Sequence, residues 1–138
     1  MGVNFGTKKF GFGCMRLPMT TGTVGMDGTV DIEQVKKMVD LFLARGFTYF
    51  DTAHGYINGK SETALKAALT SRYPRDKFIL TDKLSGYLFK DEAEMRKIFQ
   101  EQLAAAGVTY FDNCFAHAVT SESYAHYQKC HTFQFLQE

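Results

Sequence analysis

The sequence lacks the long apolar stretch that a membrane helix requires. No run in its 138 residues approaches the roughly 18 consecutive apolar positions of such a helix. The opening MGVNFGTKKF carries charge but is not followed by the apolar core of a signal peptide. Gly6 also stands where the N-myristoylation pattern requires Ser or Thr. We therefore expect no membrane partner.

Cysteine is scarce as well. Cys14, Cys114 and Cys130 are odd in number and far apart, and they form no C-x-x-C pair. This pattern indicates free thiols in a reducing cytoplasm, and it offers no closely spaced thiolates for an iron–sulfur cluster in this segment. His126, Cys130 and His131 make a metal site conceivable, but their loose spacing favours ordinary surface side chains, and we expect no metal.

An excess of either charge is also missing. The net charge is +1, and the 16 basic and 15 acidic side chains are interspersed. Without a basic face or an acidic tail, a nucleic-acid partner is not expected. Apolar residues make up 45% of the chain and charged residues 22%, which is typical of a soluble globular domain.

What the chain does contain is a regular alternation of strand and helix patterns. The segments KFGFGCMRLPM and TTGTVGMDGTV predict a short strand with a following loop, and then a Gly- and Thr-rich loop. The later predicted strands are 48–51, 78–83 and 110–116, and the predicted helices lie between Asp31 and Gly46, Ser61 and Pro74, and Asp91 and Gly107, with a further helix after 119.

Strands spaced about 30 residues apart and separated by helices are typical of right-handed βαβ units. The strands are apolar nearly throughout, as in parallel sheets buried on both faces. The sequence therefore predicts an α/β fold with four parallel strands alternating with helices. Such a sheet is either open and doubly wound or part of an eight-stranded barrel. The Rossmann fingerprint is matched poorly, because GFGCMR has Arg16 where the third glycine belongs.

Helix caps support these boundaries. Asp31 with Gln34 and Asp91 with Glu94 have the spacing of capping boxes, and Ser61 is the expected cap of the second helix.

The phrase G-x-T-Y-F-D occurs twice, at 46–51 and at 107–112, which is two βα units apart. The glycine ends a helix and the β-formers begin a strand, so the repeat itself is interpreted as structural. Asp51 falls at its strand's end, whereas Asp112 falls near its strand's start.

Polar side chains follow three of the predicted strands. Asp51 ends one strand, Tyr56 lies in the loop after it, Lys83 ends the next strand and His117 ends the last. Singly, each has an ordinary structural explanation. Because function sits at the carboxyl ends of parallel strands in both sheet types, their convergence on one edge predicts an active site.

The chemistry of these four groups is mutually consistent. A tyrosine, with a reference pKa of about 10, is a weak acid, and a nearby ammonium favours its phenolate. A carboxylate keeps that ammonium charged and oriented, and a histidine can hold a carbonyl oxygen. This set protonates a developing alkoxide, as carbonyl reduction requires, while the hydride must come from a cofactor.

The motifs resemble the aldo-keto reductase family. FDTAHGY resembles the family's D-T-A-x-x-Y signature, and FILTDK and YFDNCFAH resemble its third and fourth barrel strands. GFGCMRLPM and TDKLSGY look most like the bacterial branch whose longer members carry a C-terminal iron–sulfur region. The resemblance implies the N-terminal half of a (β/α)8 TIM barrel, with residues 1–138 as one partial domain of four βα units.

The resemblance also implies roles for particular residues. The family's catalytic Asp, Tyr, Lys and His match Asp51, Tyr56, Lys83 and His117, and the nicotinamide end of NADPH is expected near Gly13, Cys14, Met15, Arg16 and Asp51. The expected reaction is NADPH-dependent reduction of small aldehydes or ketones to alcohols.

Two departures from the family pattern bear on activity. INGKSE follows Tyr56 in place of the common Y-G-x-x-E, which predicts a longer loop. A full barrel takes about 250 residues, so this chain resembles half of one and is expected to lack part of the cofactor site. The alternative is a non-catalytic half-barrel that self-associates through its open edges. An open Rossmann- or flavodoxin-like nucleotide binder, whose phosphate loop would have only Gly11 and Gly13, ranks below both.

Overall fold

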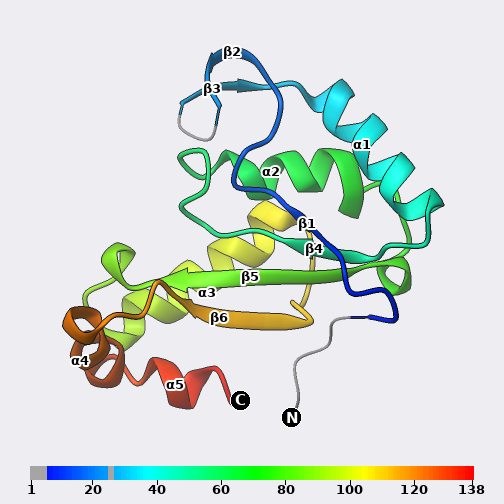
Figure 1. Cartoon of the computed structure of the whole chain (residues 1–138). Coiled ribbons are helices and arrows are strands. Elements are labelled where there is room, and N and C mark those ends of the chain that lie inside the picture. The colour runs from blue at the N-terminus through cyan, green and yellow to red at the C-terminus, as the bar shows by residue number, and fades with distance from the viewer. Residues whose placement is uncertain (1–5, 25–26) are drawn as a thin grey trace.

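The computed structural model, which describes residues 6–24 and 27–138, contains one four-stranded parallel sheet (Figure 1). Its strands are β1 (Gly11–Gly13), β4 (Tyr49–Asp51), β5 (Ile79–Ser85) and β6 (Asn113–His117). They lie side by side in chain order, and each pairs in parallel with the next. A doubly wound sheet reverses its order at a switch point, so the unreversed order is that of a half barrel and confirms the predicted fold class.

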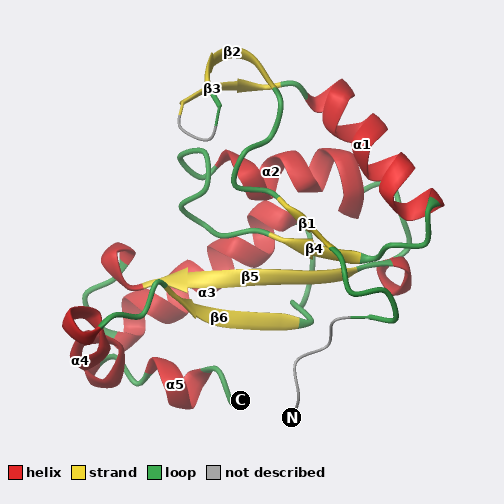
Figure 2. Cartoon of the chain, in the orientation of Figure 1, coloured by secondary structure: helices red, strands yellow, loops and turns green. Residues whose placement is uncertain are grey.

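Helices connect these strands and pack on one face of the sheet (Figure 2). The connecting helices are α1 (Ile32–Ala44), α2 (Lys60–Leu65) with the π-helical continuation η1 (Lys66–Thr70), and α3 (Glu92–Ala106), with short 3-10 turns η2 (Arg75–Lys77) and η3 (Gly86–Leu88). After the last strand follow α4 (Ser121–Lys129) and α5 (Thr132–Phe135). Among the described residues, the helices are all too short or too polar to cross a membrane.

The core forms where α1 and α2 meet β1, β4 and β5. Phe42 of α1 lies at its centre, with ring centroids 5.2 Å from Phe50 of β4, 5.4 Å from Phe12 of β1 and 5.1 Å from Phe47. Phe50 and Leu80 are fully buried on this face of the sheet. Because side chains alternate along a strand, the neighbours of Phe50 and Leu80 point to the opposite face, which carries the polar residues described below.

The first strand-to-helix connection was predicted wrongly. The Gly- and Thr-rich segment predicted as a loop contains an antiparallel hairpin of β2 (Met19–Thr23) and β3 (Asp27–Val30). Threonine is a good β-former, and Thr29 N–H donates to Thr21 Oγ1 at 3.2 Å across the pair. Gly28 has a φ of +120° and packs so tightly on Thr21 that a side chain would collide with its carbonyl. The glycines therefore permit the hairpin rather than excluding it.

Two of the predicted caps are confirmed. The backbone N–H of Gln34 donates to Asp31 Oδ1 at 2.9 Å, and that of Glu94 donates to Asp91 Oδ1 at 2.9 Å. The reciprocal half of each box differs, because Asp31 N–H donates to a proline carbonyl at 2.8 Å and the Glu94 carboxylate accepts from Lys90 N–H.

The predicted cap of the second helix is wrong. Gly59, with a φ of +80°, precedes α2, and Ser61 lies buried inside its first turn. Ser61 Oγ donates to the carbonyl of Cys14 at 3.0 Å and lies 2.8 Å from Thr52 Oγ1. The serine therefore joins α2 to the loops after β1 and β4 instead of capping the helix.

Candidate active site

Parallel register brings the carboxyl ends of the four strands together at one end of the sheet. Gly13 of β1 pairs with Asp51 of β4, and Ser85 of β5 pairs with His117 of β6. Lys83 lies two residues before Ser85, so its side chain points to the same face. Three of the residues predicted to be catalytic, Asp51, Lys83 and His117, therefore lie on the sheet face opposite the helices, and Tyr56 follows in the loop after β4.

Lys83 is the centre of this group. Its ammonium Nζ donates to Asp51 Oδ1 at 2.5 Å, to the carbonyl of Thr52 at 2.8 Å and to the phenol oxygen of Tyr56 at 3.1 Å. The Lys83 side chain is 15% exposed and that of Asp51 is 31% exposed. The three donors of the ammonium are thus all engaged, and one of them holds the tyrosine hydroxyl.

The charge of Lys83 is secured by these partners. Burial disfavours the ammonium, but the hydrogen bonds to Asp51 and Tyr56 outweigh burial, and the pKa of Lys83 lies above its usual value. Lys83 therefore stays protonated through the neutral range. The Asp51 carboxylate holds this positive charge beside the Tyr56 oxygen.

The loop after Tyr56 has an unusual backbone. Ile57, Asn58 and Gly59 have φ values of +53°, +51° and +80°. A β-branched residue rarely adopts this left-handed region, and Ile57 does so while only 1% exposed in the core. The first half of the segment INGKSE, where the sequence departs from the common pattern, is therefore a tight left-handed turn anchored by Ile57 directly beside Tyr56, and its second half begins α2.

His117 completes the group. Its ring lies edge-on to the Tyr56 ring, with centroids 5.6 Å apart, and its Nδ1 lies 2.7 Å from Ser85 Oγ. Burial and the nearby Lys83 ammonium lower the pKa of His117, which favours the neutral imidazole. With Nδ1 engaged by Ser85, Nε2 is the ring nitrogen available to a ligand.

Sequence reasoning missed Ser85. A residue two positions after Lys83 shares its face of the strand, so extending the predicted strand by one more pair would have found it. The strand was predicted to end at Lys83, whereas β5 continues to Ser85.

The residues predicted to bind cofactor divide into two groups. Gly13, Met15 and Arg16 are exposed at the end of β1, and space is open where a side chain on Gly13 would lie. Cys14 is fully buried, its backbone N–H donates to the Asp51 carbonyl at 2.9 Å, and burial raises the pKa of its thiol. Its side chain belongs to the core and does not face this edge.

Within the described residues, His, Cys, Asp and Glu side chains form no group of three that could hold a metal ion. The C-terminal histidines are engaged elsewhere. His126 Nε2 lies 2.9 Å from the Phe89 carbonyl, and His131 Nδ1 lies 2.7 Å from Glu92.

The second copy of the repeated phrase has no part in this site. Asp112 Oδ2 accepts from Leu80 N–H at 2.7 Å and from the Arg75 guanidinium at 2.6 Å, at the opposite end of β5. The aspartate that ends the repeated phrase therefore has two different roles. Asp112 binds the backbone of β5, whereas Asp51 faces Lys83.

Comparison with known proteins gives the family to which this chain belongs. Residues 9–138 match the model of the aldo/keto reductase family, and the chain belongs to that family. A comparison with curated protein sequences returned no match.

Solved structures show the same fold. An aldo-keto reductase from Bacillus halodurans, in its holo form, is similar with a TM-score of 0.70 and 23% identity, covering 96% of this chain and 45% of that one. An aldo-keto reductase from Klebsiella pneumoniae in complex with NADPH gives 0.61 and 21%, covering 78% and 34%. Aldose reductase from Giardia lamblia gives 0.54 and 22%, covering 78% and 32%. This chain therefore spans between 32% and 45% of the length of these proteins.

Proposed function

We propose that this site reduces the carbonyl of a small aldehyde or ketone to an alcohol with NADPH as the hydride source. The observation that carries the proposal is the bridge formed by Lys83 Nζ, which joins the Asp51 carboxylate to the Tyr56 hydroxyl. An acid of this kind, held beside a fixed positive charge, is suited to protonating an alkoxide.

Each residue has a distinct part in this reaction. Tyr56 Oη donates its proton to the oxygen of the substrate, and the Lys83 ammonium stabilises the phenolate left behind. Asp51 keeps Lys83 in place. His117, half-buried and with a lowered pKa that favours the neutral ring, orients the substrate oxygen through Nε2 while Ser85 fixes the ring through Nδ1.

The end of β1 fits the nicotinamide portion of NADPH, which supplies the hydride when bound. Gly13 leaves open space next to Asp51 in the register, and the exposed Met15 and Arg16 follow directly. The Cys14 thiol takes no part in this proposal because it is buried. The three free cysteines support a reducing cytoplasm as the place of action.

The test follows NADPH absorbance with a reactive aromatic aldehyde such as a nitrobenzaldehyde. If the site is catalytic, the rate should fall at least about 100-fold in Tyr56→Phe, the scale of a general-acid contribution, whereas no turnover by the unsubstituted chain would favour the non-catalytic half barrel. Tyr124→Phe is the matched control, because Tyr124 lies on α4 and is 48% exposed. Equal rates in Tyr56→Phe and the unsubstituted chain would remove Tyr56 from the mechanism.

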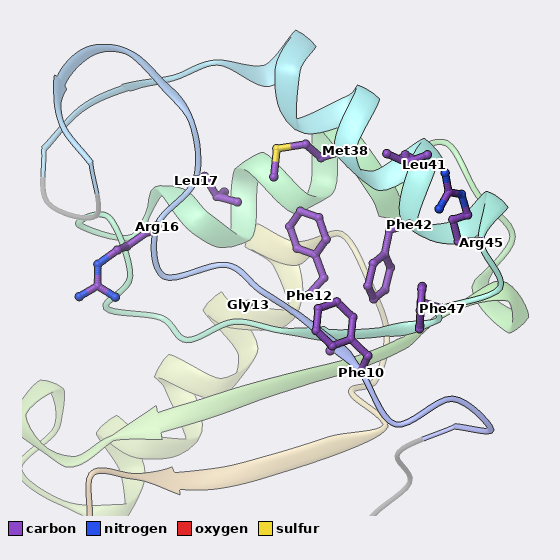
Figure 3. Close-up of a pocket in the computed structure, with 11 residues that line it drawn as sticks. Phe10, Phe12, Gly13, Arg16, Leu17, Met38, Leu41, Phe42, Arg45 and Phe47 are labelled. Carbon is purple, nitrogen blue, oxygen red and sulfur yellow. The ribbon is translucent and has the colours of Figure 1, made fainter.

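A second candidate is a non-catalytic, self-associating half barrel, which one specific observation favours. A cavity of about 440 Å³ opens between β1 and α1 on the helix-covered face. In Figure 3 the rings of Phe10, Phe12 and Phe42 gather in it, with Arg16 and Arg45 at opposite ends. Phe10 is 63% exposed and Leu41 is 58% exposed. We propose that a second copy of the chain covers this apolar cavity beside β1.

A further inference from the structure

A pair of acidic side chains lies buried behind the strand that carries Lys83. Glu62 of α2 and Asp82 of β5 are both 0% exposed. Asp82 precedes Lys83, so its side chain points to the helix-covered face, away from the catalytic group. The proposed reaction makes no use of either carboxyl.

Each carboxyl has a different set of donors. Asp82 Oδ1 accepts from the backbone N–H of Lys83 at 2.7 Å. Glu62 contacts His54 Nδ1 with both oxygens, at 2.9 and 3.2 Å. Glu62 also acts directly on Asp82, because its charge and a side-chain hydrogen bond to it both raise the pKa of Asp82. Asp82 Oδ2 receives no donor from any residue that the structure describes.

Two ionised carboxylates in this arrangement would be strongly unfavourable. A carboxylate only accepts hydrogen bonds, so two of them in contact and away from water repel each other without a proton between them. A single proton on Asp82 Oδ2 removes the repulsion and lets this oxygen donate a hydrogen bond to Glu62. Glu62 faces the imidazole, which supports a negative charge, whereas Asp82 receives only a neutral backbone donor.

We propose that Asp82 and Glu62 share one buried proton, carried on Asp82 and donated to Glu62, and that this link with His54 holds together the backbone segments of Tyr56 and Lys83. The link begins at His54, two residues before Tyr56, passes through Glu62 to Asp82 and ends at the backbone N–H of Lys83. His54, Glu62 and Asp82 are positioning residues in this scheme. Their positioning role rests on the proposed reductase function, but the location of the proton does not.

The charged and titratable groups around the pair agree with this arrangement. Burial and then Glu62 raise the pKa of Asp82, against the opposing effect of Lys83. The hydrogen bond to Glu62 raises the pKa of His54, in spite of its partial burial. The other titratable neighbours are the thiols of Cys14 and Cys114, whose pKa values burial also raises, and Glu101 of α3, whose charge raises the pKa of His54. The buried amide of Gln102 donates from Nε2 to the Lys83 carbonyl at 3.1 Å.

The proton can be located by NMR with carboxyl-13C-labelled Asp and Glu, assigned through D82N and E62Q. At pH 7 we expect the Asp82 carbon at the shift of a neutral acid and the Glu62 carbon at the shift of a carboxylate. The titration of His54 should fall to lower pH in E62Q and keep its position in D82N. Two carboxylate signals, or the acid signal on Glu62, would overturn the proposal.

Stability gives an independent measurement. Asp82 has a raised pKa in the folded state, so its contribution is fully present below its unfolded pKa and is lost as pH rises toward the folded pKa. D82N does not titrate, and its amide can donate to Glu62. The folding constant of D82N relative to the unsubstituted chain should therefore rise by up to about tenfold per pH unit above pH 5. D76N, at an exposed position, should show no such rise, and a flat ratio for D82N would contradict the proposal.

The positioning role is tested by rescue. D82A removes the link and should displace the ring resonances of Tyr56 at pH 7 and lower kcat more than it changes KM. D82N restores the link and should return both to the values of the unsubstituted chain. If the unsubstituted chain shows no turnover, the proposed reductase function fails. The Tyr56 resonances still show whether Asp82 positions Tyr56. Identical Tyr56 resonances in D82A and the unsubstituted chain would sink the positioning role.

Discussion

At the residue scale, the two copies of G-x-T-Y-F-D use the same aspartate differently. The side chain of Asp112 is 17% exposed and accepts from both the Leu80 N–H and the Arg75 guanidinium. Asp112→Ala leaves that backbone donor unpaired, so we expect the free energy of unfolding to fall by about 1–3 kcal/mol. Asp76→Ala, at a side chain 74% exposed, should change it by less than about 0.5 kcal/mol. Urea unfolding measures both, and equal costs would contradict the structural role of Asp112.

The protonation of His117 is a second prediction at this scale. Burial and the Lys83 ammonium lower its pKa, so the neutral imidazole persists to lower pH than in an exposed histidine, which titrates near 6.5. We expect the NMR titration midpoint of His117 to lie below about 6.5. Replacing Lys83 with Met removes one of the two causes and should raise that midpoint. A midpoint above 6.5 in the unsubstituted chain would be inconsistent with the site as described.

Functional residues could be predicted from the sequence where their place at the end of a strand determines their role. Residues whose role depends on side-chain packing between elements could not be predicted. Lys83 and His117 could be found because they lie at or near the carboxyl ends of apolar strands. The contact of Glu62 with Asp82 could not, because it joins a helix to a strand through side chains pointing into the core. Cys14 was expected beside the cofactor from its place in the motif, yet alternation along the chain turns its thiol inward.

At the element scale, the N-terminus of α3 offers a direct test of a predicted cap. Asp91 accepts from the N–H of Glu94, and removing this acceptor leaves a helix donor unpaired. We expect Asp91→Ala to lower the free energy of unfolding by about 1 kcal/mol. Lys90→Ala is the control, because Lys90 is exposed and its backbone N–H still reaches the Glu94 carboxylate. A cost no greater than that of the control would show that the cap does not stabilise α3.

Elements were predicted where local signals agree and missed where they conflict. At Asp31 and Asp91 the capping residue, the apolar spacing and the closing glycine all indicate one helix. In 19–30 the glycines indicated a loop while the threonines favoured strands, and cross-strand pairing decided for a hairpin. At Ser61 the capping preference was real, but burial against Cys14 and Thr52 gave the hydroxyl other partners.

At the scale of the whole molecule, the order of the strands could be predicted because each βα unit places its strand beside the previous one. What lies beyond the outer strands could not. Among the described residues β1 pairs only with β4, and β6 pairs only with β5. Both edges therefore have unpaired backbone groups, and exposed edges of this kind favour pairing with another chain.

These edges and the cavity beside β1 lead to the last prediction. Two copies related by a twofold axis can place β6 of each beside β1 of the other, all in parallel, which gives the eight strands of a closed barrel. Such pairing would also cover Phe10 and Leu41, two of the exposed apolar side chains at this cavity. We expect sedimentation velocity to show a dimer whose population rises with concentration.

The double variant Phe10→Ser/Leu41→Ser should shift that equilibrium to the monomer, because it removes apolar area from the contact. Tyr87→Ser is the matched control, since Tyr87 is 74% exposed on η3 and lies away from the cavity. Circular dichroism of each variant shows whether its helices are retained, so that dissociation is separated from unfolding. A monomer across a wide concentration range would exclude the second copy as occupant, and an unchanged dimer in the double variant would place the contact elsewhere on the surface.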